Sequence, residues 1–197
     1  APDPTFIEAV MSASEANADG PLAPFYSETD GADREQLRID LAADYNQLFL
    51  GMSAHPVAPY ESVYTSEEGL MFQDAYHEVF QLYKANHVAK AGGYDFPHDH
   101  LSFMCEFLVV LSDRIIAALE AGDDAEALRQ VRVSRAFLAD HILSWFDTFQ
   151  DLALLLLETR FYRGVLKISK GFFLEDAELL DAIAVELEQR LEAREER

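Results

Sequence analysis

Hydrophobic residues recur along most of this chain at the three-to-four-residue spacing of helices. No stretch shows the alternation and β-branched density of a strand, so the pattern predicts an all-α protein. With 197 residues the chain is long enough for one helical domain, which we expect to cover residues 1–197. The expected helices cover residues 5–16, 32–50, 73–89, 97–121, 125–137, 140–159, 161–172 and 176–195.

Two segments interrupt the helical pattern. Residues 17–31 are rich in Pro, Gly, Asp and Ser, which predicts a flexible loop. Residues 51–66 hold two prolines among several aromatic rings, which predicts an extended, ordered loop. Gly51 suits the C-terminal cap of the helix that precedes this second loop.

The segment from Phe96 to Leu101 brings two histidines and a carboxylate to the start of a very apolar stretch. Proline fits the first position of a helix, so we expect a helix to begin at Pro97. Asp99 would then lie in the first turn, where the helix dipole favours a carboxylate by about 0.3 to 1 kcal/mol. The dipole explains one carboxylate but not the flanking histidines, and the segment is therefore a candidate site.

On this helix Asp99, Glu106 and Asp113 would share one stripe, because residues seven apart nearly superimpose. An acidic stripe beside apolar side chains suits a peptide that is both basic and hydrophobic. The alternative is a solvated face on a helix that is otherwise buried. The sequence leaves both interpretations open.

Composition narrows the classes of partner. Lys plus Arg of 15 against Asp plus Glu of 36 gives a net charge of −21, which repels nucleic acid and anionic membranes and favours a cationic partner, or serves solubility alone. The longest aliphatic run, residues 152–157, is far shorter than the roughly 20 residues that cross a bilayer, so no membrane insertion is expected.

The sequence offers little for catalysis. Its single cysteine, Cys105, excludes an internal disulfide, indicates a reducing compartment and has apolar neighbours that raise a thiol pKa. There is no nucleophile elbow, phosphate-binding loop or dinucleotide fingerprint. We expect a cytoplasmic protein that is not an enzyme and carries no cofactor.

Two alternatives remain open. The first is a helical metal-dependent enzyme that uses His98, Asp99, His100 and Glu106, although the two histidines would point about 200° apart on a helix. The second is an acidic scaffold that recognises folded partners through its charged face.

Several segments also match the motifs of one protein family, in that family's order. They are residues 44–51 (Tyr-x-x-Leu-Phe-x-Gly), 58–64 (Pro-aromatic-x-Ser-Val-aromatic), 69–72, 96–101 (Pro-x-Asp-His and an apolar residue), 141–145 (His-Leu-x-x-Trp) and 161–162 (aromatic-Tyr). From Leu37 to Leu180 the chain therefore resembles the TorD/DmsD/NarJ family of molybdoenzyme assembly chaperones.

The resemblance implies an all-helical chaperone without catalytic activity. Such a protein binds the twin-arginine signal peptide and the apo form of a molybdopterin-containing oxidoreductase, and assists cofactor insertion before export. Monomers and domain-swapped homodimers both occur in the family. The signal-peptide-binding residues that the resemblance and the acidic stripe assign are Tyr60, Ser62, Val63, Tyr64, Phe72, Pro97, Asp99, His100, Leu101 and Glu106.

Hypotheses follow for three parts of this site. Asp99 pairs with an arginine of the peptide. His100 orients Asp99 or responds to pH. Aromatic rings such as Tyr60 and Phe72 hold apolar side chains of the peptide. Three departures from the family are expected. The usual first helix is expected to be missing, since the sequence opens at Ala1. His98 replaces an often acidic or polar residue, and Tyr60 stands where several relatives carry tryptophan.

Overall fold

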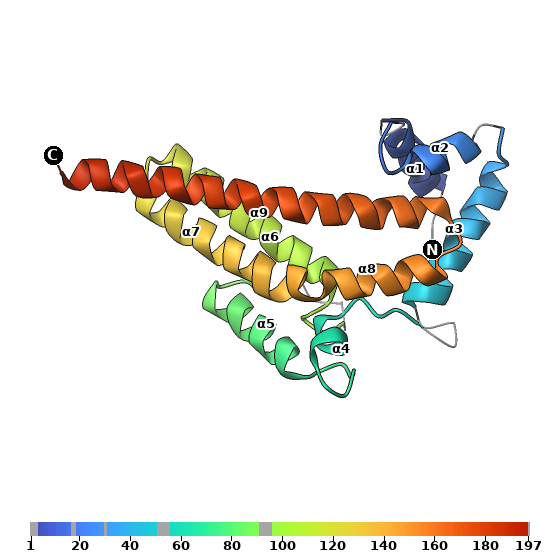
Figure 1. Cartoon of the computed structure of the whole chain (residues 1–197), viewed down its shortest axis with the longest axis horizontal. Helices are drawn as coiled ribbons and strands as arrows, with labels where there is room; N and C mark the ends of the chain where they lie inside the picture. Colours follow the sequence, from blue (N-terminus) through green and yellow to red (C-terminus); the bar gives the residue numbers. More distant parts are fainter. Residues whose placement is uncertain (1–3, 17–18, 30, 51–55, 91–95, 197) are drawn as a thin grey trace. The chain divides into compact units, whose positions relative to one another are not determined.

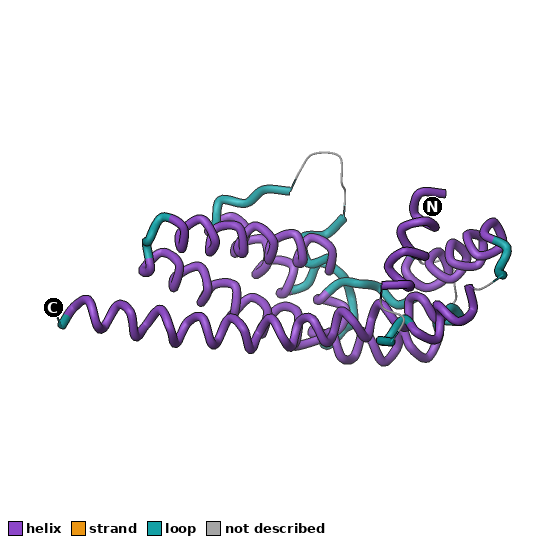
Figure 2. The backbone as a smooth tube through the Cα atoms, turned by 90° about the horizontal axis from the view of Figure 1, so that it is seen from above, coloured by secondary structure: helices purple, strands orange, loops and turns teal. Residues whose placement is uncertain are grey.

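The computed structural model describes residues 4–16, 19–29, 31–50, 56–90 and 96–196. Within these residues the chain is helix and connecting loop, as Figures 1 and 2 show, and the one strand-like feature is an isolated bridge between Tyr60 and His100. The all-α prediction is confirmed. The elements are α1 (Pro4–Ala16), α2 (Ala23–Thr29), α3 (Arg34–Phe49), α4 (Glu61–Thr65), α5 (Asp74–Ala85), α6 (Leu101–Glu120), α7 (Asp124–Phe137), the π-helical segment η1 (Leu138–Leu143), α8 (Ser144–Leu156) and α9 (Arg160–Glu195).

The structure corrects four of the expected boundaries. Helix α2 lies within the expected loop 17–31, and α4 lies within the expected loop 51–66. Helix α9 runs through the expected break between residues 172 and 176, because Phe173 is buried against Phe146 and a single glycine costs a helix only about 1 kcal/mol. The proposed cap Gly51 lies outside the described residues.

A further correction concerns α6, which begins at Leu101 and not at Pro97. The side chain of His100 takes the N-cap position, where its Nδ1 accepts the backbone N–H of Ser102 at 3.1 Å. Pro97 therefore belongs to a turn before the helix, and Asp99 is not in the first turn of α6.

Internal contacts group the chain into two compact units, which are described in turn. The first unit contains residues 1–58 and 147–171. Its core is formed by Val10, Leu22, Phe25, Leu41 and Phe161. Helix α9 approaches the turn before α2 so closely at Gly164 that an added Cβ would lie 2.5 Å from the Leu22 side chain and 2.8 Å from the Pro21 carbonyl oxygen.

A buried carboxylate anchors the connection between α8 and α9 in this unit. Asp44 of α3 accepts the backbone N–H groups of Glu158 at 3.1 Å and Thr159 at 2.8 Å, and the hydroxyl of Thr159 as well. These bonds satisfy donors that a helix start leaves without intrahelical partners. A carboxylate distant in sequence thus fixes where α9 begins.

The second unit contains residues 59–146 and 172–197. Helix α7 packs along α6 (Figure 1). Two surface ion pairs connect α7 to the C-terminal half of α9: Arg132–Glu188 at 2.7 Å and Arg135–Asp181 at 2.9 Å. The core of this unit is aromatic and aliphatic. Its fully buried members include Phe107, Leu111, Leu138, Ile142, Trp145, Phe146 and Leu187.

One turn of π-helix, η1, interrupts the passage from α7 to α8. Such turns often occur at functional positions, because they rotate the following side chains relative to the regular helix. Here the turn contains His141, whose carbonyl oxygen accepts the indole N–H of Trp145 at 2.6 Å. The π turn thereby places His141 and Trp145 beside α4.

Candidate peptide-binding surface

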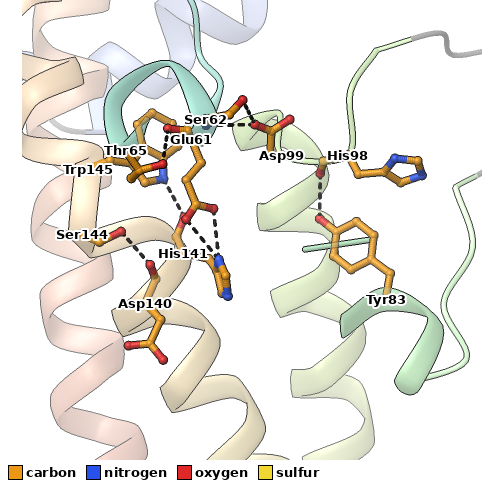
Figure 3. A network of polar contacts seen from close by, with 10 residues as sticks. All are labelled: Glu61, Ser62, Thr65, Tyr83, His98, Asp99, Asp140, His141, Ser144 and Trp145. Atoms are coloured by element: carbon orange, nitrogen blue, oxygen red, sulfur yellow. Dashed lines mark hydrogen bonds and ion pairs between the residues drawn. The ribbon is translucent and has the colours of Figure 1, made fainter. Parts of the chain in front are cut away.

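The carboxylate of Asp99 is completely buried and holds the start of α4 (Figure 3). Its Oδ2 accepts the backbone N–H of Ser62 at 2.9 Å and the Ser62 hydroxyl at 2.5 Å. Its backbone oxygen accepts the N–H of Glu61 at 3.1 Å. In this arrangement Asp99 cannot reach an arginine outside the protein, which corrects the expected contact between its carboxylate and the peptide.

His100 lies half-buried among aromatic rings. Its ring centroid is 4.9 Å from that of Tyr60, 5.6 Å from that of Phe96 and 6.0 Å from that of Phe103. Burial lowers the pKa of His100, against the opposing charge of Asp99. Its Nδ1 is occupied by Ser102, so the described contacts make His100 a helix cap and not a group that orients Asp99.

His98 turns the other way. Figure 3 shows the Asp99 side chain directed to Ser62 and the His98 ring pointing away from it. The ring of His98 lies 4.7 Å from Phe80 and 5.3 Å from Tyr76, centroid to centroid. Burial, and then the charge of Lys90, lowers the pKa of His98.

The structure brings some of the expected site residues together and separates others. The turn before α6 meets the start of α4 through the Ser62–Asp99 bonds, the Tyr60–His100 bridge and a bond from the Leu101 N–H to the Pro59 oxygen at 2.9 Å. We call this junction the corner. Of the residues that the sequence assigned to peptide binding, the corner contains Tyr60, Ser62, Pro97, Asp99, His100 and Leu101.

Apart from Val63, whose N–H donates to the Tyr60 carbonyl oxygen at 3.2 Å, the remaining expected residues take no part in the bonds of the corner described above. Tyr64 stacks on Trp145, with centroids 5.2 Å apart and planes at 14°, so its ring is engaged by the core. Its neighbour Val63 is half-buried on the same short helix. Glu106 is exposed on α6 and Phe72 is exposed in the α4–α5 loop. With Asp99 outside the helix, the acidic stripe on α6 contracts to exposed carboxylates from Glu106 onward.

A buried ion pair beneath α4 was not anticipated from the sequence. Both carboxylate oxygens of Glu61 lie 3.1 Å from Nδ1 of His141 (Figure 3). Burial raises the pKa of Glu61, although the hydrogen bond and charge of His141 oppose the shift. Burial alone would lower the pKa of His141, but the hydrogen bond and charge of Glu61 outweigh it, so that pKa is raised. No local sequence pattern pairs residues 80 positions apart, so the pair had no signal that sequence reasoning could have used.

The loop between α4 and α5 exposes three large apolar side chains in succession: Leu70, Met71 and Phe72. Phe72 is 55% exposed and has a φ of 63°, a left-handed conformation that is strained for a bulky side chain. The same loop lines a polar hollow of about 380 Å³ whose carboxylates are Glu67, Glu68 and Asp74. We call residues 66–74 the presenting loop.

The described residues offer no group of three or more His, Cys, Asp and Glu side chains that could hold a metal ion. His98, Asp99, His100 and Glu106 diverge, as the contacts above require. Cys105 fits the expectation for an unreactive thiol, because burial raises its pKa to about 11. The geometry thus provides no support for the metal-dependent alternative.

Comparison with known proteins identifies the class to which this helical fold belongs. A sequence profile of the nitrate reductase delta subunit family matches residues 12–151. The chain therefore belongs to this family, which includes the TorD and NarJ chaperones, and it is a chaperone and not an enzyme.

Individual relatives agree. The chain is 29% identical over 148 residues to the chaperone protein TorD of Vibrio vulnificus strain YJ016, covering 75% of this chain and 67% of that protein. It is 27% identical over 154 residues to the chaperone protein TorD of Vibrio cholerae strain O395, covering 78% and 68% respectively. Photobacterium profundum carries a further similar TorD chaperone, 26% identical over 147 residues, with 75% of this chain and 67% of that protein covered. None of the helices in the described ranges combines the length and hydropathy needed to cross a membrane.

Asp99→Ala is expected to lower the free energy of unfolding by about 2 to 3 kcal/mol, because it leaves buried donors of Ser62 without an acceptor. Urea denaturation measures this loss. Glu106→Ala, an exposed change on α6, is the control and should stay within about 0.5 kcal/mol of the parent protein. Equal stability of the two variants would contradict a structural role for Asp99.

The Glu61–His141 pair predicts a pH dependence of stability. The pKa of His141 is raised in the folded protein, so its contribution is complete below the unfolded value of about 6.5 and is lost as pH rises through the folded value. Glu61→Gln removes the charge that raises this pKa, and urea midpoints between about pH 6 and 8 should therefore fall less with pH than in the parent protein. Glu67→Gln, an exposed change, should leave the parent slope intact.

Proposed function

We propose that this chain is a cytoplasmic chaperone for a molybdopterin-containing oxidoreductase. It binds the N-terminal twin-arginine signal peptide of that enzyme and assists cofactor insertion before export. Membership of a family described as nitrate reductase delta subunits, and similarity to proteins named TorD chaperones, support this client class.

The presenting loop is the observation that carries the proposal. A twin-arginine signal peptide joins two guanidinium groups to an apolar segment. The loop offers the complement, exposed Leu70, Met71 and Phe72 beside carboxylates around a polar hollow, in a chain with a net charge of −21. Carboxylates bind guanidinium groups strongly through paired hydrogen bonds, and exposed apolar patches are typical of interaction sites.

The corner contributes in a different way. Phe96 is exposed, and Tyr60 and His100 are half-buried, so their rings provide apolar surface. Asp99 acts from the interior by holding α4, and through α4 it supports the start of the presenting loop. Pro97 and Asp99, which the resemblance assigned to peptide binding, are thus proposed to support the surface from the interior.

Calorimetry with a synthetic twin-arginine signal peptide tests the proposed function. We expect binding that weakens at least tenfold when both arginines are replaced by lysine, because lysine keeps the charge but loses the paired hydrogen-bond geometry. Failure to bind any twin-arginine peptide would overturn the proposal and favour the scaffold that recognises folded partners only.

Phe72→Ser should weaken binding of this peptide about tenfold, since it removes the exposed aromatic ring of the presenting loop. Its matched control is Phe172→Ser, which alters a Phe of similar exposure, 58% against 55%, on α9. Because both rings are exposed, urea denaturation should show little loss of stability for either. Equal peptide affinity of the two variants would exclude the presenting loop from the binding surface.

A further inference from the structure

An apolar groove of about 660 Å³ lies in the second unit, a size typical of ligand sites. Leu82 and Asn86 of α5 form one wall, α7 forms the other, and Phe107 of α6 takes part in the lining. On α7 the groove is lined by Leu128, Val133, Ala136 and Phe137, and it continues to Asp140 and His141 of η1. None of the residues expected from the sequence to bind peptide lines this groove.

One face of α5 connects the presenting loop with the groove. Asp74, Glu78, Leu82 and Asn86 follow one another at four-residue intervals and so share one face of the helix and its C-terminal cap. The first pair is acidic, and the second pair lines the groove. Asp74 also lines the polar hollow of the presenting loop. The face therefore changes from carboxylate to apolar over about 18 Å.

The basic residues that line the groove have acidic partners, whereas two carboxylates near its η1 end have no basic partner among the described residues. Arg129 and Arg132 lie on its lining but are paired with Glu126 and Glu188, each at 2.7 Å. No Lys or Arg of the described residues pairs with Glu78 or Asp140. The end nearest η1 thus keeps carboxylates available to a cation.

Two buried polar side chains face this otherwise apolar groove. Asn86 is 8% exposed and spends its amide N–H on the Leu82 carbonyl oxygen at 2.9 Å, which leaves its oxygen as an acceptor. His141 is 9% exposed and bonds Glu61 through Nδ1, which leaves Nε2 to the groove. A few polar groups in an apolar pocket orient a ligand, and here they match the N–H and C=O of a peptide backbone.

We propose that the groove between α5 and α7 continues the surface that the presenting loop begins: the arginines bind between the two, at Glu78 and Asp140, and the apolar segment that follows them enters the groove. This inference rests on the proposed function and gives the peptide a direction: arginines toward the start of α5 and apolar residues toward its end. Asn86 and His141 bond the peptide backbone.

A groove-filling variant tests the site. Ala136 is exposed and lines the groove, so Ala136→Trp fills the groove without disturbing the core, and it should weaken binding of the twin-arginine peptide at least tenfold. The matched control is Ala117→Trp on the exposed side of α6, which should bind like the parent protein. Equal affinity of the two variants overturns the groove while leaving the proposed function intact. Absence of binding to the parent protein overturns both.

A charge variant tests the direction. Glu78→Gln should reduce the preference for the arginine peptide over its lysine counterpart at least threefold, whereas Asp113→Asn on α6 should leave this preference unchanged. A photo-crosslinking residue in the apolar segment of the peptide provides a test in the unmodified protein. Crosslinks to α5 and α7 support the groove, and crosslinks confined to other helices overturn it.

Discussion

The buried carboxylate of Asp99 is the constraint on which α4 and the proposed binding surface depend. A two-turn helix is too short to form by itself, because nucleation is unfavourable and few backbone bonds repay it; α4, with five residues, is shorter still. Asp99 supplies an acceptor to the backbone and the hydroxyl of Ser62, and its carbonyl takes the N–H of Glu61. The turn before α6 therefore decides where α4 begins and where the presenting loop leaves it.

Once α4 is fixed, the remaining polar contacts follow from its orientation. Glu61 is directed into the unit, where an isolated carboxylate would be costly, and His141 meets it from the π-helical turn. Tyr64, one turn later, stacks on Trp145, whose N–H is satisfied by the His141 carbonyl oxygen. A single polar network thus connects α4 with η1, and His141 also forms part of the groove lining.

Periodicity was enough to predict the helical class and most helix positions, because amphipathic spacing is a local property. It placed the start of α6 four residues early, since the N-cap preference of His100, once bonded to Ser102, outweighed the preference of Pro97 for a first helical position. The role of Asp99 and the Glu61–His141 pair were beyond local reasoning, because each joins residues that are far apart in the chain and become neighbours only after packing. Phe72 is different, because residues 69–72 match a motif of the family and the sequence therefore singled this residue out before its exposure was known.

Two aspartates in the segments that resemble the family, Asp44 and Asp99, serve the scaffold. Asp44 holds the connection to α9 in the first unit, and Asp99 holds α4 in the second, each as a buried acceptor of backbone N–H groups. A carboxylate in that position is needed whatever peptide is bound, so these motifs report a shared fold more than a shared ligand. In the proposed function, discrimination between peptides would fall to exposed groups, which are the side chains of the presenting loop and Glu78 on the face of α5.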